Sequence, residues 1–227
     1  MNIYIDIETI PGQAPWIKED IAANIAPPGN MKKAETIEKW EKEDKPGLIE
    51  EAWRKTALNG TLGEIICIGY AVDDNDPVMT ARGLMESEAD MLIHFYAKLV
   101  KSLTDKNDFV RRPTWIGHYI TGFDLRFIWQ RSVIHGVKPP VEIPVNAKPW
   151  ADFVFDTKTE WSGYNQYNSS SSLDMVSRVL GFDGKGDMDG SKVWDTVLAG
   201  DLDSVIKYCA KDVTDVRKVY KRLTFQG

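Results

Sequence analysis

The chain has 227 residues, of which 43% are hydrophobic and 27% are charged, a balance that suits one medium-sized domain with a full core. The formal net charge of −6 argues against a protein that coats nucleic acid through bulk electrostatics. No apolar run reaches the length of a membrane span, and the first residues already have a strand pattern instead of a targeting segment. Cys67 and Cys209 lie in apolar or amphipathic segments, which favours buried free thiols. We therefore expect a cytoplasmic protein without a membrane partner.

Residues 2–8 predict a buried strand, because apolar residues surround its polar positions. Asp6 and Glu8 are two positions apart in this strand and therefore point to the same face. Burying them together is costly, because each carboxylate loses its hydration and the like charges repel. A divalent cation bound by both would offset this cost, since hard cations prefer several carboxylate oxygens. The alternative is an exposed strand end with two solvated acids.

Residues 13–60 differ from the rest of the chain. Turn sequences at 27–29 and 46–47 flank a stretch rich in Lys and Glu. Apolar residues recur there at helical spacing, which predicts two or three short amphipathic helices. We expect a helical insertion within a single domain of residues 1–227. The charged stretch favours a solvated helix face, with a partner site as the alternative.

The rest of the chain alternates between strand and helix patterns. We expect strands at residues 63–72, 78–81, 113–118 and 153–157, and helices at residues 87–103, from 123 onward, at 175–180, 192–198 and about 202–223. The turn between the first two of these strands predicts a hairpin. This order of elements predicts an α/β domain with a mixed sheet.

Two further groups of residues carry chemistry. Asp124 lies at or near a helix start, where the helix dipole favours a carboxylate, so a plain helix cap is the alternative to a functional role. Tyr208 and Asp212 are four positions apart on the last helix and share one face. Each pattern is common when it stands alone.

Taken in order, the motifs resemble the DEDD superfamily of 3′–5′ exonucleases. The set is Asp-x-Glu on the first strand, Gly…Phe-Asp opening a helix, and Tyr-x-x-x-Asp on a late helix. The closing motif resembles the DEDDy branch, which includes the proofreading domains of family-B DNA polymerases. The resemblance covers about residues 2–10 and 62–223 and leaves the insertion outside. It implies a ribonuclease H-like fold and hydrolysis of phosphodiester bonds from a free 3′ end, with single-stranded DNA favoured. An RNA 3′-end-trimming exoribonuclease and a catalytically silent nucleic-acid-binding or scaffold protein are the alternatives.

The resemblance also implies two Mg²⁺ or Mn²⁺ ions, which suit oxygen ligands. In such enzymes Asp6 would bridge both ions, Glu8 and Asp212 would hold the ion that activates the attacking water, and Asp124 would support the other. Tyr208 would orient the water, since an ordinary tyrosine pKa near 10 makes it a poor base at neutral pH. Two ions about 3.5–4 Å apart stabilise both the attacking and the leaving oxygen.

Substrate contacts follow less directly from the sequence. Thr9 and Ile10 come directly after the first motif, and we expect them to touch the terminal nucleotide. Tyr119 stands where relatives often carry Asn, at a position that shapes the substrate end. For Phe123 we favour packing in the core over contact with a base. For His118 we favour a structural role over a role in the site.

The last helix also carries a basic stretch, which comprises Arg217, Lys218, Lys221 and Arg222. A solvated helix face is favoured there, and a phosphate track is the alternative. The sequence contains no polymerase or helicase region, so a role in replication or repair would require a partner protein.

Overall fold

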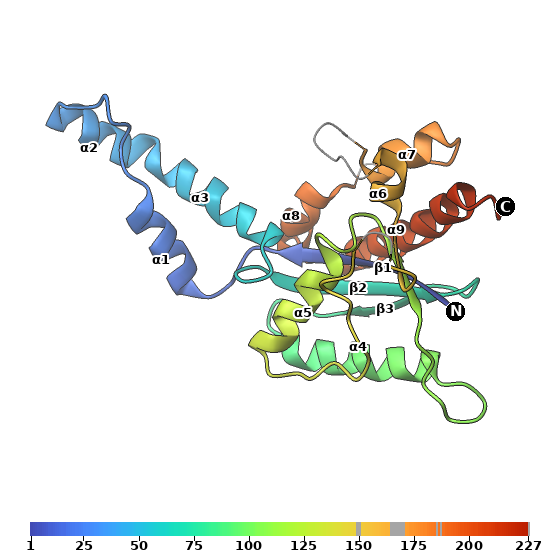
Figure 1. Ribbon diagram of the computed structural model, residues 1–227. Coiled ribbons are helices and arrows are strands. Elements are labelled where there is room, and N and C mark those ends of the chain that lie inside the picture. Colours follow the sequence, from blue (N-terminus) through green and yellow to red (C-terminus); the bar gives the residue numbers. More distant parts are fainter. Residues whose placement is uncertain (149–150, 164–170, 185, 187, 227) are drawn as a thin grey trace.

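The structure is a computed structural model that describes residues 1–148, 151–163, 171–184, 186 and 188–226. Its centre is a mixed sheet of five strands in the order β3-β2-β1-β4-β5 (Figure 1). The strands are β1 (Asn2–Ile10), β2 (Glu64–Val72), β3 (Val78–Ala81), β4 (Thr114–Gly117) and β5 (Val154–Asp156). Strand β1 is antiparallel to β2 and parallel to β4, so the sheet changes direction at its central strand.

The described helices either flank this sheet or project from it (Figure 1). They are α1 (Pro15–Asn24), α2 (Ala34–Glu43), α3 (Lys45–Lys55), α4 (Glu88–Leu103), α5 (Asp124–Ile134), α6 (Thr157–Ser162), α7 (Leu173–Val179), α8 (Val193–Leu198) and α9 (Leu202–Leu223), with short 3₁₀ turns η1 (Thr56–Leu58) and η3 (Gly190–Lys192). Helices α4 and α5 pack on one face, and α9 packs on the other (Figure 1). The predicted α/β fold with a mixed, ribonuclease H-like sheet is confirmed.

The alternation of side chains along β1 decides where its acids point. Ile3, Ile5 and Ile7 are buried in the cluster with α4 and α5, whereas Tyr4 is buried in the cluster with α9. Successive strand residues point to opposite faces, so Asp6 and Glu8 share the face on which α9 lies. The pairing with β2 shifts register directly after Glu8. Such a bulge bends a strand and re-aims the side chains beside it.

The helical insertion projects away from the sheet as an arm formed by α1, α2 and α3 (Figure 1). Two hydrogen bonds join the end of the arm to Gly12 at its start: Trp53 Nε1 donates to the Gly12 oxygen at 2.8 Å, and Gly12 N donates to Thr56 Oγ1 at 3.0 Å. A third bond runs from Thr9 Oγ1 to the Ala57 oxygen at 2.7 Å. The arm therefore returns to the end of β1 and places η1 beside it.

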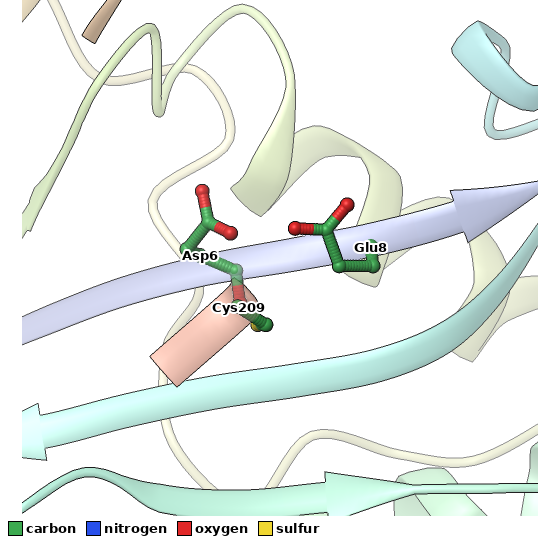
Figure 2. Close-up of side chains that lie close together, drawn as sticks. All are labelled: Asp6, Glu8 and Cys209. Carbon is green, nitrogen blue, oxygen red and sulfur yellow. The ribbon is translucent and has the colours of Figure 1, made fainter. Parts of the chain in front are cut away.

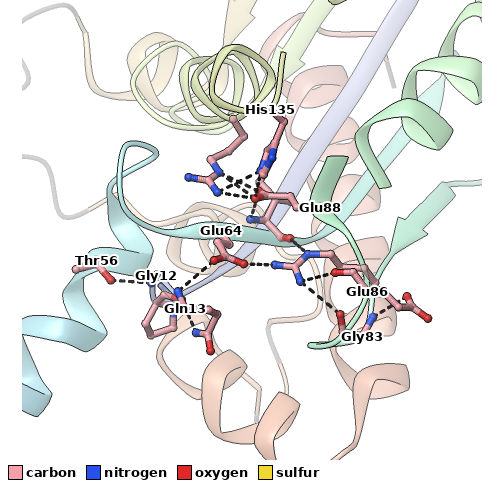
Figure 3. A network of polar contacts seen from close by, with 12 residues as sticks. Gly12, Gln13, Thr56, Glu64, Gly83, Glu86, Glu88 and His135 are labelled. Atoms are coloured by element: carbon pink, nitrogen blue, oxygen red, sulfur yellow. Dashed lines mark hydrogen bonds and ion pairs between the residues drawn. The ribbon is translucent and has the colours of Figure 1, made fainter. Parts of the chain in front are cut away.

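A network of paired charges lies at the start of β2 (Figure 3). Glu88, the first residue of α4, accepts hydrogen bonds from Ile65 N at 2.7 Å and from Arg131 Nη2 at 2.6 Å. Arg82 donates to Glu64 Oε2 at 2.6 Å and to the Ile65 oxygen at 2.9 Å. These bonds join β2, the residues after β3, α4 and α5.

The elements agree with the predicted ones except at a few ends and at one additional helix. Strand β1 extends beyond the predicted residue 8, because Thr9 and Ile10 continue to pair with β2 after the bulge. Helix α6 was not predicted, and Asp156 caps it by accepting bonds from the backbone of Lys158 and Thr159 at 3.1 and 3.3 Å. Among the described helices, none combines the length and the apolar character needed to cross a membrane.

Candidate active site

The acids of β1 form the floor of the site. Figure 2 shows the carboxylates of Asp6 and Glu8 on the same side of β1, with Cys209 of α9 beside them. One ligand atom from each of these three residues lies within 4.8 Å of the others. Burial raises the pKa of Cys209 well above its ordinary value, and its thiol donates to the Asp6 backbone oxygen at 3.5 Å. A protonated thiol is a poor ligand for a hard cation, so the carboxylates are the candidate ligands in this group.

Helix α9 brings Tyr208 and Asp212 onto the same floor. Both side chains are buried, and the Tyr208 hydroxyl donates a hydrogen bond to Asp212. Gly69 lies opposite Asp6 in the β1–β2 pair, and a Cβ there would lie only 3.1 Å from Cys209 Sγ and 2.7 Å from a Met79 side-chain carbon. The absence of a side chain at Gly69 therefore lets α9 approach the sheet closely.

Asp124 reaches the site from the first position of α5. Its Oδ1 accepts a hydrogen bond from Ile7 N at 3.2 Å, between the two acids of β1. Phe123 occupies the cap position of the helix. The Asp124 carboxylate thus accepts a bond from β1, which a plain helix cap would not require. This bond attaches the start of α5 to the central strand.

The surroundings of the site raise the pKa values of Asp124 and Tyr208. Burial, followed by the negative charges of Asp156 and Asp212, raises the pKa of Asp124 to about 8. Burial and the charges of Asp212, Glu8 and Asp6 raise the pKa of Tyr208 above its ordinary value of 10.0. The Tyr208 hydroxyl therefore remains protonated at neutral pH and acts there as a hydrogen-bond donor.

Most of these side chains line one hollow of about 220 Å³, but Asp124 is not among its wall residues. Its walls include Asp6, Glu8, Thr9, Ala57, Leu58, Phe123, Gly190, Tyr208 and Asp212. The structure thus brings together the acids predicted on β1 and α9, and Asp124 joins them through its bond to Ile7. Carboxylate oxygens from three elements are a donor set that suits Mg²⁺ or Mn²⁺, so the residues fit the cations implied by the resemblance.

The predicted substrate contacts divide into lining and buried residues. Thr9 lines the hollow, and its hydroxyl is bonded to Ala57. Phe123 also lines it, while its ring packs 5.4 Å from the ring of Phe127, so it serves both the wall and the core. Ile10 is 0% exposed and packs in the cluster that contains Trp53. A direct substrate contact requires an exposed side chain, which Ile10 does not offer.

Tyr119 is 40% exposed and adopts a left-handed backbone with φ of 66°. A non-glycine residue in this region is uncommon and marks a locally constrained loop. The Lys158 ammonium lies 4.4 Å from the centre of the Tyr119 ring. A Cβ at Gly122 would lie 2.4 Å from that ring, so the glycine provides space for it.

Asp156 is a residue that sequence reasoning missed. It is 1% exposed and lies opposite Gly117 in the parallel β4–β5 pair. Its carboxylate accepts from Tyr119 N at 3.0 Å and from Thr121 Oγ1 at 3.3 Å, in addition to capping α6. One buried acid therefore holds the loop that leads into Asp124. A single Asp at the end of a short strand gave no signal for this role.

His118 and the basic stretch of α9 bind other parts of the chain. His118 Nδ1 lies 3.0 Å from Thr157 Oγ1, and its Nε2 lies 2.8 Å from the Ser171 oxygen, which fits a structural histidine. In the basic stretch, Arg217 Nη1 donates to the Asn75 oxygen at 2.7 Å. Lys218 pairs with Asp215 of the same helix at 3.1 Å, and Lys221 pairs with Asp74, so these three cations have partners within the protein.

A mixed sheet of this order, with acids on its first strand and on helices packed against both faces, is the arrangement of a ribonuclease H-like fold. The chain belongs to the family described as "Predicted 3'-5' exonuclease related to the exonuclease domain of PolB", which matches residues 56–226. That range contains Asp124, Tyr208 and Asp212, whereas Asp6 and Glu8 precede it.

A solved structure with a similar fold is the family B DNA polymerase from the hyperthermophilic archaeon Pyrobaculum calidifontis. The similarity has a TM-score of 0.55 at 14% sequence identity. It covers 73% of this chain and 22% of the polymerase chain, so this chain corresponds to a small part of that enzyme. A search among curated proteins gave no match.

Proposed function

We propose that the protein is a metal-dependent 3′–5′ exonuclease that removes nucleotides from the 3′ end of nucleic acid, with single-stranded DNA as the favoured substrate. The observation that carries the proposal is the hollow that Asp6, Glu8, Tyr208 and Asp212 line together, with Asp124 of α5 bonded to the backbone between the two acids of β1. Membership of an exonuclease family supports the reaction class. The complete acidic set argues against a catalytically silent scaffold, while an RNA 3′-end-trimming exoribonuclease is the alternative substrate class.

Asp6, Glu8, Asp124 and Asp212 would hold two divalent cations, Mg²⁺ or Mn²⁺. When bound, such ions stabilise the charge that develops on the reacting phosphate and favour deprotonation of water. Glu8 and Asp212 would hold the ion that favours deprotonation of water, Asp124 would help to hold the other, and Asp6 would contribute to both. This division of roles comes from the resemblance and belongs to the proposal.

Tyr208 would position the attacking water. Its hydroxyl keeps its proton, because burial and neighbouring acids raise its pKa. It can therefore donate a hydrogen bond but does not serve as the general base at neutral pH. Thr9 and Phe123 would contact the terminal nucleotide at the wall of the hollow, and Tyr119 would contact it from the loop before Asp124.

The experiment uses 5′-labelled DNA and RNA oligonucleotides of one sequence, with Mg²⁺ or Mn²⁺ and with or without a chelator. We expect stepwise shortening from the 3′ end, no digestion in chelator and none when the 3′ end is blocked. Asp6→Ala should abolish turnover, whereas Asp20→Ala on the exposed surface of α1 should retain it. Full activity in Asp6→Ala would reject the metal assignment, and rapid cutting of circular strands would indicate an endonuclease.

The proposal includes three broader expectations. We propose that residues 1–227 form a single domain with the insertion at about 13–60. A cytoplasmic setting is supported by two cysteines that are both buried and free, as in proteins of reducing compartments. A replication or repair protein would be its partner, and affinity purification of the protein from its own cells tests this.

A further inference from the structure

A second hollow of about 490 Å³ lies beside the hollow that contains the acids. The two share Thr9, Ala57, Leu58 and Gly190 in their walls. They are therefore neighbouring parts of one groove, and the end of the insertion forms the boundary between them.

The sizes of the two parts indicate different occupants. The acidic part, at about 220 Å³, is below the range of roughly 300–1,000 Å³ typical of small-ligand sites. The second part, at about 490 Å³, falls within that range. The acidic part has room for a reacting phosphate group, and the second part has room for a larger unit attached to it.

The insertion supplies the apolar surface of this second part. Leu58, in η1, is 71% exposed and lines both hollows. Trp194 of α8 lies on the wall of the second hollow. An exposed apolar side chain beside a charged site offers a surface for the face of a nucleobase, because every base has an apolar π-face.

The insertion also supplies the positive charge. Lys55, at the end of α3, lines the second hollow and pairs with Glu51 at 2.7 Å, with side-chain exposures of 68% and 63%. Such exposed pairs contribute only about 0–1 kcal/mol, so a phosphate can compete with Glu51 for the ammonium. The neighbouring Arg54 instead binds Asp195 at 2.8 Å, which joins the arm to α8 across the groove.

We propose that the second hollow holds a nucleoside unit of the substrate strand, with its base against Leu58 and a backbone phosphate at Lys55. The inference rests on the proposed function and assigns the insertion a part in it. The last turn of the arm then forms a wall of the substrate groove.

The test measures the dissociation constant of a 5′-fluorescein-labelled single-stranded DNA 12-mer in Ca²⁺ at several salt concentrations. Lys55→Glu should weaken binding about tenfold at low salt and reduce the slope of log Kd against log salt by about 1, as for one lost phosphate contact. Lys42→Glu is the matched control, because Lys42 pairs with Glu38 at 2.9 Å in the same order along helix α2, with exposures of 73% and 68%. The control should change neither quantity by more than about twofold, since it leaves the groove untouched.

Leu58→Ala gives a second, independent signature. It should weaken binding by about tenfold at every salt concentration without changing the slope, because it removes a base contact and no charge. Lys55 and Leu58 are both largely exposed, so the variants should have the same melting temperature as the wild type. If Lys55→Glu and Leu58→Ala bind like Lys42→Glu while the wild type digests DNA, the groove is rejected and the exonuclease stands. If the binding pattern holds but the wild type releases no nucleotide in Mn²⁺, the exonuclease is rejected and the groove stands.

Discussion

Two buried carboxylates, at the starts of two helices on the same face of the sheet, have opposite electrostatic surroundings. Glu88 is 5% exposed and Asp124 is 3% exposed, so burial is nearly equal. Glu88 is held by Arg131 Nη2 at 2.6 Å and by His135 Nε2 at 2.8 Å (Figure 3). The charges that act on Asp124 include those of Asp156 and Asp212, which have the same sign as its own.

The pKa values follow this difference. Burial alone would raise the pKa of Glu88, but the Arg131 ion pair and the hydrogen bonds to Ile65 and His135 hold it below its ordinary value. At Asp124, burial and like charges act together and raise the pKa to about 8. The first region uses its acid to stabilise the fold. In the second region, the like charges around Asp124 lower the stability of the fold. A bound cation would offset this cost.

The largest effect should come from breaking the balanced region. Glu88→Gln leaves the Arg131 guanidinium buried without its counter-charge, and loss of one partner of a buried pair costs about 3–5 kcal/mol. Urea unfolding at pH 7 measures this loss. Asp90→Asn, an exposed acid on the same helix, is the control. Equal stability of the two variants would mean that Glu88 is not a structural anchor.

In the acidic region, substitutions should change the reaction rate much more than the stability of the fold. Tyr208→Phe keeps the ring and removes only the hydroxyl, so the rate should fall by roughly 10–10³-fold while unfolding changes by about 1 kcal/mol or less. Asp212→Asn should instead weaken metal binding, and higher Mn²⁺ should partly restore its activity. Rates measured against metal concentration distinguish the two variants. A Tyr208→Phe enzyme as fast as the wild type would make this tyrosine a packing residue.

Removing the charge of Asp124 should stabilise the metal-free protein. A carboxyl group has a pKa near 3.9 in the unfolded chain, and Asp124 has one of about 8 in the fold. The wild type therefore loses stability as pH rises between these values, whereas Asp124→Asn does not ionise. The gain from the variant should be smallest near pH 4 and should grow progressively up to pH 8, because over this range only the wild type carries a charge that its folded state disfavours.

Urea unfolding in chelator across this pH range measures the gain from Asp124→Asn. Mn²⁺ should then stabilise the wild type more than the variant, because a ligand stabilises the state that binds it. A difference between the two proteins that does not vary with pH would contradict the raised pKa.

The smallest effect should come from Asp156. Its surroundings are intermediate between those of Glu88 and Asp124, because backbone N–H groups donate hydrogen bonds to its carboxylate. Asp156→Asn keeps one acceptor oxygen but loses the charge and the bond from Thr121, so it should cost about 1 kcal/mol. Thermal unfolding measures this cost, and Thr121→Val removes the hydroxyl bond alone. Equal stability of all three proteins would show that the loop before Asp124 is held by other contacts.

Much of the fold and the site core follows from local spacing. The i, i+2 spacing of Asp6 and Glu8 and the i, i+4 spacing of Tyr208 and Asp212 specify faces within single elements, which the sequence displays directly. The final helix was predicted at about 202–223 and spans Leu202–Leu223.

The remaining features arise from contacts between distant segments. Asp156 gains its role only because β5 pairs with β4, and Glu88 meets an arginine 43 positions away. Ile10 is covered by the cluster of Trp53 and Trp194, whose rings meet 5.4 Å apart. These tryptophans come from the insertion and α8, and no local pattern reveals that they meet.

The three hydrogen bonds at the base of the arm have an evolutionary consequence. They involve Thr9, Gly12 and the segment from Trp53 to Ala57, and none involves the distal turn between α1 and α2. Lengthening or shortening that distal turn leaves all three bonds intact, so relatives can diverge there freely. The same turn is the place to graft a tag or a tether in protein engineering, because a change there leaves the attachment of the arm to β1 unaltered.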